Sequence, residues 1–331
     1  MVNRDIGFSL WLDFVEREYL KNEFSSLIEK GIINGATSNP AIFASAITTS
    51  PAYAEQLKSL EGKSPKEKYE ALAIEDIKTA AQALRGCYDA GNDGYISIEV
   101  DPFLSNDTKG TVEEGKRLFT TIGEPNVMVK VPATDAGYAA MKELLSMGIS
   151  VNATLIFSPK QAQRCLKAMK QGLSEYEISG GGRCEAVISV FVSRFDRLLD
   201  TALSQEGIEV SKTGIYNAAK IYNIIEASAI PSIRTLFAST GVKGDALAAD
   251  YYMRELLAPH SVNTAPLATI ESYIATAAGE PKLPIEDDIL RGYFTKLEDN
   301  GFNMEEIYKE LLNDGLVAFE EAFSSMLDTL K

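Results

Sequence analysis

Histidine and cysteine, the residues that build most metal sites and many catalytic triads, are scarce in this sequence. His260 is the single histidine among 331 residues, so a zinc site with two or three imidazole rings is excluded and a Ser-His-Asp triad has one candidate base. Because it directly follows Pro259, we interpret His260 as structural. The three cysteines are far apart and form no CxxC pair, which argues against a disulfide framework and a zinc ribbon. We expect them to be small buried hydrophobic residues.

Positively charged residues and long apolar runs are also few. There are 32 Lys and Arg against 47 Asp and Glu, a net charge of −15, so binding to a nucleic-acid phosphate backbone is not expected. No apolar run reaches the ~18 residues of a membrane helix. The start, MVNRDIGFSLWLDF, shows no basic region followed by a hydrophobic block. We therefore expect a cytoplasmic protein with no membrane or nucleic-acid partner, and the sequence leaves open whether it is a monomer or a homodimer.

The chain does contain a regular alternation of strand-like and helix-like segments. Segments with helical spacing occur at 111–123, 135–148 and 158–173, and several begin at a Ser, Thr or Asp that suits an N-cap. Strands that alternate with helices pair in parallel, so eight such units predict a single (β/α)8 barrel, or TIM barrel, over residues 1–331. Short runs rich in Val, Ile and Phe predict the strands at 7–14, 32–39, 94–100, 126–132, 149–157, 185–192, 234–239 and 260–266.

Two longer segments predict extra helices. Residues 39–87, between the second and third strands, predict two or more helices. Residues 303–330 predict one or two amphipathic C-terminal helices, packed on the outside of the barrel or over one end. No GxGxxG or GxxxxGK[ST] motif follows a strand, which counts against dinucleotide-binding and P-loop folds.

Side chains alternate between the two faces of a strand, so one parity of each barrel strand points into the interior. In NVMVKVP the apolar row is Val127, Val129 and Val131, and Lys130 lies on the other side. Four more strands divide in the same way, with predicted helix-facing rows Leu10, Leu12, Phe14; Ile96, Ile98, Val100; Val151, Ala153, Leu155, Phe157; and Ile188, Val190, Val192. The opposite parity places a polar set inside the barrel: Asp13, Glu99, Lys130, Asn152, Thr154 and Ser189.

Such an interior is too polar for packing alone, because each buried polar group needs a partner to offset its lost hydration. One interpretation is an ion-pair network of Lys130 with Asp13 and Glu99 that serves only the fold. The other is an active site inside the barrel and at the C-terminal ends of its strands, where barrel enzymes carry their chemistry.

A lysine beside two carboxylates suits one chemistry in particular. A neutral amine attacks a carbonyl to form a Schiff base, which stabilises a carbanion on the adjacent carbon. Carboxylates can move the protons that imine formation and carbon–carbon cleavage require. Metal-dependent enolate chemistry would use several histidines, and the chain has one. Amides and hydroxyls suit a polyhydroxylated substrate, and the candidates are Asn39, Asn152, Thr154 and Ser189.

Eight short motifs follow one another along the chain: LWLD (10–13), TSNPAIF (37–43), SIEVDP (97–102), VMVKVPAT (127–134), SVNATLIFS (150–158), ISVFVSRFD (188–196), FASTG (237–241) and VNTAP (262–266). They resemble the motifs of the transaldolase family, in the class I aldolase superfamily, and occur in the family's order. The resemblance implies a transferase of the non-oxidative pentose phosphate pathway that needs no metal or organic cofactor. It would transfer a dihydroxyacetone unit from sedoheptulose 7-phosphate or fructose 6-phosphate to glyceraldehyde 3-phosphate or erythrose 4-phosphate.

Carried over motif by motif, the resemblance implies a role for each polar residue. Lys130 would form the Schiff base, and Asp13 would be the general base at the hydroxyl of the cleaved bond. Glu99 and Thr154 would hold the water that shuttles protons. The substrate would be bound by Asn39, Asn152, Ser189, Phe191, Arg194 and Ser239, the last two at the phosphate. Many family members have a second arginine after this serine; here the text is FASTGVKG, so Lys243 is either its replacement or a solvated loop lysine.

Three alternatives remain open. Fructose 6-phosphate aldolases of the same superfamily release free dihydroxyacetone. In that group the residue at the position of Glu99 is Gln, and the residue at the position of Phe191 is Tyr. Both residues here favour transaldolase. A pyridoxal enzyme would need a pyridine partner that is not obvious in the chain. A catalytically inactive barrel used as a binding protein is disfavoured by the intact Lys130, Asp13 and Glu99.

Overall fold

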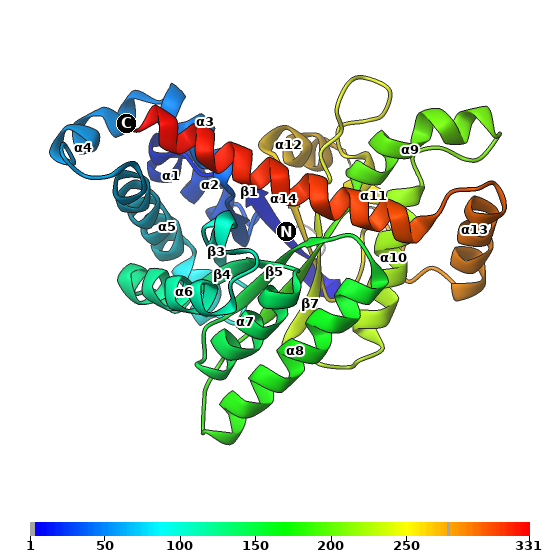
Figure 1. The fold of residues 1–331 in the computed structure, drawn as a ribbon, viewed down its shortest axis with the longest axis horizontal. Helices are drawn as coiled ribbons and strands as arrows, with labels where there is room; N and C mark the ends of the chain where they lie inside the picture. The colour runs from blue at the N-terminus through cyan, green and yellow to red at the C-terminus, as the bar shows by residue number, and fades with distance from the viewer. Residues whose placement is uncertain (1–3, 277–278) are drawn as a thin grey trace.

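A closed barrel of eight parallel strands, surrounded by helices, forms the protein in a computed structural model that describes residues 4–276 and 279–331 (Figure 1). The strand order follows the chain, and β8 pairs back with β1. The predicted (β/α)8 barrel is confirmed, and each strand overlaps its predicted range. The strands are β1 (Ser9–Asp13), β2 (Gly35–Thr37), β3 (Ile96–Glu99), β4 (Val127–Pro132), β5 (Val151–Ile156), β6 (Ala186–Phe191), β7 (Ile233–Ala238) and β8 (Ser261–Ala265).

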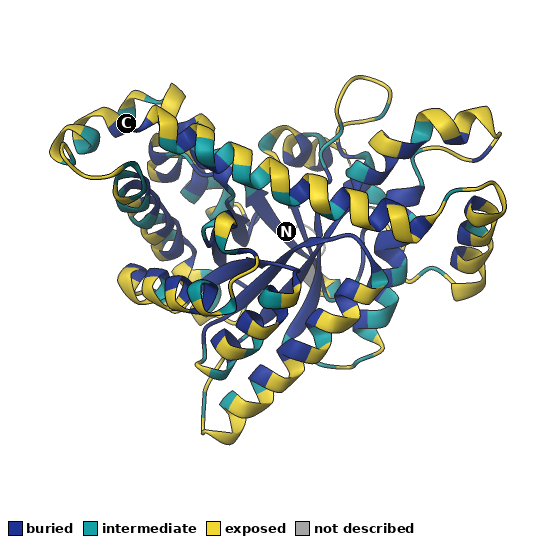
Figure 2. Cartoon of the chain, in the orientation of Figure 1, coloured by how far each residue is buried: buried dark blue, intermediate teal, exposed yellow. Residues whose placement is uncertain are grey.

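The helices lie outside the barrel, with exposed outer faces and buried inner faces (Figure 2). Asp107, Thr134 and Ser158 cap three of them by accepting a hydrogen bond from a first-turn N–H. In the described part of the chain, no helix is long and apolar enough to cross a membrane. The α-helices are α1 (Arg17–Lys21), α2 (Glu23–Glu29), α3 (Pro40–Thr49), α4 (Ala54–Ser59), α5 (Pro65–Asp89), α6 (Thr108–Ile122), α7 (Asp135–Ser146), α8 (Pro159–Ile178), α9 (Ser193–Gln205), α10 (Thr213–Glu226), α11 (Tyr251–Glu255), α12 (Leu267–Ala275), α13 (Asp287–Asp299) and α14 (Met304–Thr329).

Both segments that predicted extra helices contain them. Residues 39–87 hold α3, α4 and most of α5, and the C-terminal segment is the single long helix α14. In Figure 1 this helix, coloured red, runs across one end of the barrel. The predicted packing of a C-terminal helix on the barrel is therefore confirmed.

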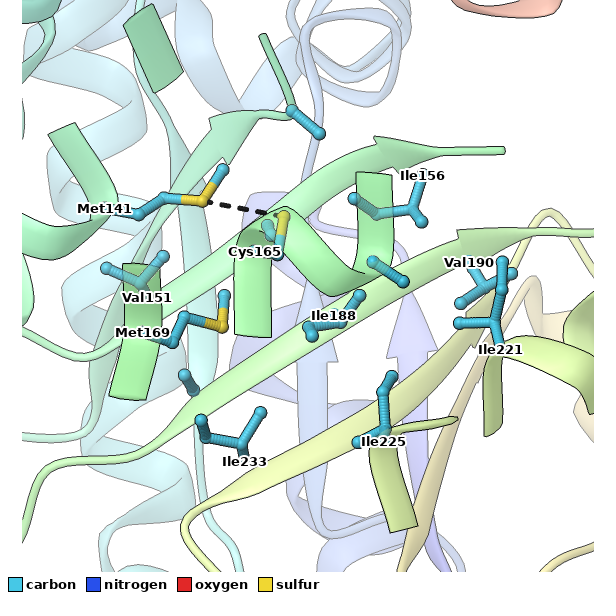
Figure 3. Close-up of a cluster of buried hydrophobic side chains, with 14 of the residues drawn as sticks. Met141, Val151, Ile156, Cys165, Met169, Ile188, Val190, Ile221, Ile225 and Ile233 are labelled. Atoms are coloured by element: carbon cyan, nitrogen blue, oxygen red, sulfur yellow. Dashed lines mark hydrogen bonds between the residues drawn. The ribbon is translucent and has the colours of Figure 1, made fainter. Parts of the chain in front are cut away.

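The helix-facing rows of the strands pack against the surrounding helices. Side chains of β5, β6 and β7 interlock with those of α7, α8 and α10 in one apolar cluster (Figure 3). There the Cys165 Sγ lies 3.9 Å from the Met141 Sδ. Cys165 and Cys184 are buried as predicted, whereas Cys87 is partly exposed.

The predicted helix-facing row is wrong in the second half of β5. Leu155 and Phe157 belong to the apolar cluster that fills the barrel and continues beneath α14, whereas Ile156 packs against the helices. The pairing of β5 with β6 shifts register between Ala153 and Ile156, and Leu155 has a φ of 59°. A bulge of one residue exchanges the two faces of the strand beyond it, and this explains the error.

Trp11 fills the barrel below the polar residues. Its side chain is 0% exposed, and its Nε1 donates a hydrogen bond of 2.8 Å to Asp93. Gly35 pairs with Trp11 across β1 and β2, and a Cβ built on Gly35 would lie 2.3 Å from the indole Nε1. Glycine is therefore the residue that lets the indole lie flat against β2.

We expect Gly35→Ala to lower the free energy of unfolding by about 1–3 kcal/mol, because the added methyl group overpacks a rigid, fully buried indole. Urea unfolding followed by circular dichroism measures this. Gly86→Ala is the matched control: its Cβ meets nothing within 4 Å in α5, so the change should be neutral or slightly stabilising. Equal stabilities of Gly35→Ala and the wild type would contradict this packing.

Candidate active site

A cavity of about 240 Å³ lies at the C-terminal ends of the strands, which we call the mouth of the barrel. Most of the predicted site residues line it: Asp13, Asn39, Lys130, Thr154, Ser189, Phe191, Arg194 and Ser239. Residues not singled out from the sequence complete the lining: Thr37, Ala41, Ala238, Thr264, Ala318 and Phe319. The fold thus gathers side chains from most of the strands around one space.

Lys130 extends from the middle of β4 into this cavity and is 6% exposed. Its Nζ lies 3.3 Å from Glu99 Oε2, because Glu99 is its direct neighbour in the pairing of β3 with β4. Nζ also donates a hydrogen bond of 3.2 Å to the Ser38 carbonyl oxygen. The amine is therefore held by its own strand, a neighbouring carboxylate and a backbone acceptor.

The two predicted catalytic carboxyl groups both bind protons more tightly than usual. Burial raises the pKa of Glu99 to about 7, although the charge of Lys130 acts in the opposite direction. Burial also raises the pKa of Asp13, opposed by Lys130 and by a hydrogen bond from Thr37. Groups that titrate closer to neutral pH are better general acids and bases, so the raised pKa values suit proton transfer by both Glu99 and Asp13.

The raised pKa of Glu99 makes folding stability depend on pH. Its folded-state pKa of about 7 exceeds the ordinary 4.5, so the carboxyl stabilises the fold below pH ~4.5 and loses that contribution as the pH rises to about 7. Compared with Glu99→Gln, the wild type should lose stability progressively between pH ~4.5 and ~7 and stay level above that range. Urea unfolding of both proteins at several pH values measures the difference. A difference that does not vary with pH would contradict the raised pKa.

Asp13 ends β1 and is oriented by two threonines. The Thr37 hydroxyl donates a hydrogen bond of 2.7 Å to Asp13 Oδ1, and its oxygen lies 2.6 Å from the hydroxyl oxygen of Thr264. Because the Thr37 hydroxyl donates its one proton to Asp13, the Thr264 hydroxyl is the donor in the bond between the two threonines. The chain of bonds leaves Asp13 Oδ2 available to a ligand in the cavity.

A second polar chain runs through the barrel beside Lys130. The Asn152 amide donates to Ser97 Oγ at 2.9 Å, and Ser189 Oγ donates to Asn152 Oδ1 at 2.6 Å. Asn152 is fully buried and does not line the cavity; it reaches the cavity through Ser189. The buried hydroxyl of Thr154 has no hydrogen-bond partner among the described residues, which leaves it available to a substrate or a water.

Arg194 stands on the other side of the cavity, in the first turn of α9. Burial lowers its pKa, as does nearby Arg197, while Asp314 acts in the opposite direction. Its guanidinium lies over the Phe191 ring at 5.3 Å and makes no ion pair with a carboxylate in residues 4–276 and 279–331. No side chain caps the N-terminus of α9, and Ser239, which has a φ of 56°, lies 3.0 Å from Ser193 between hydroxyl oxygens. A guanidinium without a carboxylate partner, beside the N-terminus of a helix, suits an anionic group.

Lys243 is the predicted site residue that the structure leaves outside this arrangement. It lies exposed in the loop after β7 and is not among the described residues that line the cavity. Asn39 is in place: its Oδ1 accepts from the Ile42 N–H and caps α3, so its NH2 group remains for a ligand.

The sequence offered a signal for some of the missed residues but not for others. The alternation of side chains predicts that Thr37 and Thr264 face inward once β2 and β8 are paired with β1. Trp11 faces inward and pairs with Gly35 and Thr264, and Thr37 lies two residues after Gly35 on the same face of β2. Nothing local in the sequence places Phe319 of α14 in the cavity, because only tertiary packing brings it there.

A larger hollow of about 570 Å³ lies between α8, α10, α13 and α14. Its charged side chains are at least partly exposed, and they are Lys160, Lys220, Glu298 and Glu305. The smaller cavity is lined instead by the buried Lys130, whose amine pairs with the buried Glu99 carboxyl just behind the lining. The candidate active site is therefore the cavity at the mouth.

Two comparisons relate the chain to known proteins. The family model described as Transaldolase/Fructose-6-phosphate aldolase matches residues 10–330. A protein named Transaldolase from Campylobacter jejuni subsp. jejuni serotype O:23/36 (strain 81-176) is 46% identical over 334 residues, covering 98% of this chain and 99% of that protein. A protein named Transaldolase from Helicobacter pylori (strain HPAG1) is 42% identical over 323 residues, covering 97% and 99%.

Proposed function

Since this chain belongs to the transaldolase/fructose-6-phosphate aldolase family and is a transferase, we propose that it moves a dihydroxyacetone unit between sugar phosphates. The donor is fructose 6-phosphate or sedoheptulose 7-phosphate, and the acceptor is erythrose 4-phosphate or glyceraldehyde 3-phosphate. This reaction belongs to the non-oxidative pentose phosphate pathway, and we propose the cytoplasm as its location.

The reaction begins at Lys130. Its neutral amine attacks the C2 carbonyl of the donor, and the resulting carbinolamine loses water to give a Schiff base. Glu99, with its pKa near 7, exchanges the necessary protons through a water held with the Thr154 hydroxyl. The carboxyl 3.3 Å from Nζ supports this role, because it can take the proton of the amine and return one to the departing hydroxyl.

Cleavage then depends on Asp13. Its carboxylate removes the proton of the C4 hydroxyl, the C3–C4 bond breaks, and the electron pair moves into the Schiff base to leave an enamine on Lys130. The shortened aldose phosphate leaves, a second aldose enters, and the same steps run in reverse with Asp13 as the acid. The bond from Thr37 supports this role, because it fixes Oδ1 and leaves Oδ2 to act.

Arg194 and Ser239 bind the phosphate at the far end of the sugar, beside the N-terminus of α9. Asn39 and Ser189 bind hydroxyls of the three-carbon unit, and Asn152 orients Ser189. Lys243 attracts the phosphate from outside the cavity as a point charge on the loop after β7.

One observation carries the proposal: in a chain of this family, a buried lysine amine shares the cavity at the mouth with the Asp13 carboxyl and lies 3.3 Å from the buried Glu99 carboxyl. The nearest alternative is release of free dihydroxyacetone. Fructose 6-phosphate should be consumed rapidly with erythrose 4-phosphate and only slowly without it, and sedoheptulose 7-phosphate should appear. Equal rates of consumption with and without acceptor, accompanied by free dihydroxyacetone, would identify the aldolase instead.

A further inference from the structure

The long helix α14 is fixed across the mouth of the barrel at both of its ends (Figure 1). Near its start, the Tyr308 hydroxyl donates a hydrogen bond of 3.0 Å to Asn217 Oδ1 of α10. Near its end, Lys68 donates a hydrogen bond of 2.8 Å to the Leu330 carbonyl oxygen, and Phe323 packs edge-on against Tyr69 with 5.4 Å between ring centroids. Because α14 is held on opposite sides of the barrel, it covers the cavity in a fixed position.

The middle of α14 lies very close to the strands below it. A Cβ built on Gly315 would lie 2.9 Å from Leu155 Cδ2 and 3.4 Å from Arg194 Nη1. Leu155 reaches this position because the bulge in β5 turns it toward α14. The small residues Gly315 and Ala318 therefore let α14 approach the site closely.

This close approach places an aromatic ring above the reactive amine. Lys130 Nζ lies 5.7 Å from the centroid of the Phe319 ring, and Phe319 lines the cavity. Glu99 and the Ser38 carbonyl oxygen occupy other sides of the same amine. The amine thus has polar partners that belong to the barrel and an apolar cover that belongs to α14.

We propose that Phe319 is a specificity-determining residue that favours transfer of the three-carbon intermediate to an aldose over its release by water; this rests on the proposed function. Release requires a proton on the nucleophilic carbon of the enamine, which regenerates an iminium ion, and then a water on the iminium carbon. The C–N bond breaks, giving dihydroxyacetone and the free amine of Lys130. An aromatic ring over the amine offers no hydrogen bond to water, so it keeps away water that could protonate the enamine carbon, two bonds from Nζ, while the water held by Glu99 and Thr154 still serves the imine.

The test compares dihydroxyacetone release from fructose 6-phosphate without acceptor with transfer to erythrose 4-phosphate. Phe319→Ala should raise the ratio of release to transfer about tenfold. Phe319→Leu, which keeps an apolar cover, should raise it less. Val317→Ala is the matched control, because Val317 lies two residues away on α14, is 42% exposed and does not line the cavity. It should leave the ratio unchanged.

The outcomes separate this inference from the proposed function. A wild type that neither transfers nor forms an adduct reducible by borohydride contradicts the proposed function itself. A wild type that transfers, together with a folded Phe319→Ala protein of unchanged ratio, overturns only the role of Phe319. If Phe319→Ala does not fold, Phe319→Leu decides: it removes the aromatic ring and keeps an apolar side chain, so an unchanged ratio in that variant also overturns the inference.

Discussion

Replacing Lys130 with alanine should reduce kcat/KM for transfer on the order of 10⁵-fold, because no other amine in the described cavity lining can form the Schiff base. The remaining groups would still bind sugar phosphate, so binding of fructose 6-phosphate should persist. Steady-state kinetics with fructose 6-phosphate and erythrose 4-phosphate measure the loss. Lys116→Ala, at an exposed position of α6, is the matched control and should leave the rate unchanged.

Stability separates a catalytic role for Lys130 from a purely structural one. A buried ammonium group loses its hydration, and the neutral side chain of Lys130→Met removes that cost while Glu99 takes up a proton. We therefore expect Lys130→Met to be as stable as the wild type or more stable, yet inactive. A variant that unfolds readily would favour the ion pair as a structural element, and one that retains a tenth of the activity would exclude Lys130 as the nucleophile.

Replacing Asp13 with asparagine should give the second-largest loss, about 10³-fold in kcat, by a different route. The amide cannot take the proton of the C4 hydroxyl, so the C3–C4 bond stays intact. Schiff-base formation depends on Lys130 and Glu99, and it should continue. Borohydride reduction should therefore trap the whole six-carbon sugar on the Asp13→Asn protein.

The control for this prediction is the wild type treated in the same way, which should yield the three-carbon adduct once the aldose has left. Thr37→Val, which removes the hydrogen bond to Asp13 Oδ1, should give a smaller loss in kcat and still cleave the sugar. A three-carbon adduct formed by Asp13→Asn at the wild-type rate would show that another group is the base.

Much of the site could be predicted because strand parity is a local property. The row Val127, Val129 and Val131 assigned Lys130 to the barrel interior, and the pairing of β3 with β4 placed Glu99 beside it. Resemblance to a family added roles that parity cannot supply, such as phosphate binding at Arg194. Those roles remain proposals that the cavity geometry supports.

The features that could not be predicted depend on tertiary packing. The bulge in β5 reverses Leu155 and Ile156, and no residue type in SVNATLIF signals a break in alternation. The position of Phe319 follows from the path of α14 across the mouth, which is set by contacts at its two ends. Amphipathic periodicity predicts such a helix but does not specify the surface on which it packs.

The proposed reaction depends most directly on the Lys130 amine, and one measurement tests its role. The protein is incubated with fructose 6-phosphate, reduced with borohydride, digested and analysed by mass spectrometry. We expect a three-carbon adduct on the peptide that contains Lys130 and no adduct on the same peptide of Lys130→Ala. A protein that transfers the three-carbon unit without any adduct on Lys130 would contradict the account.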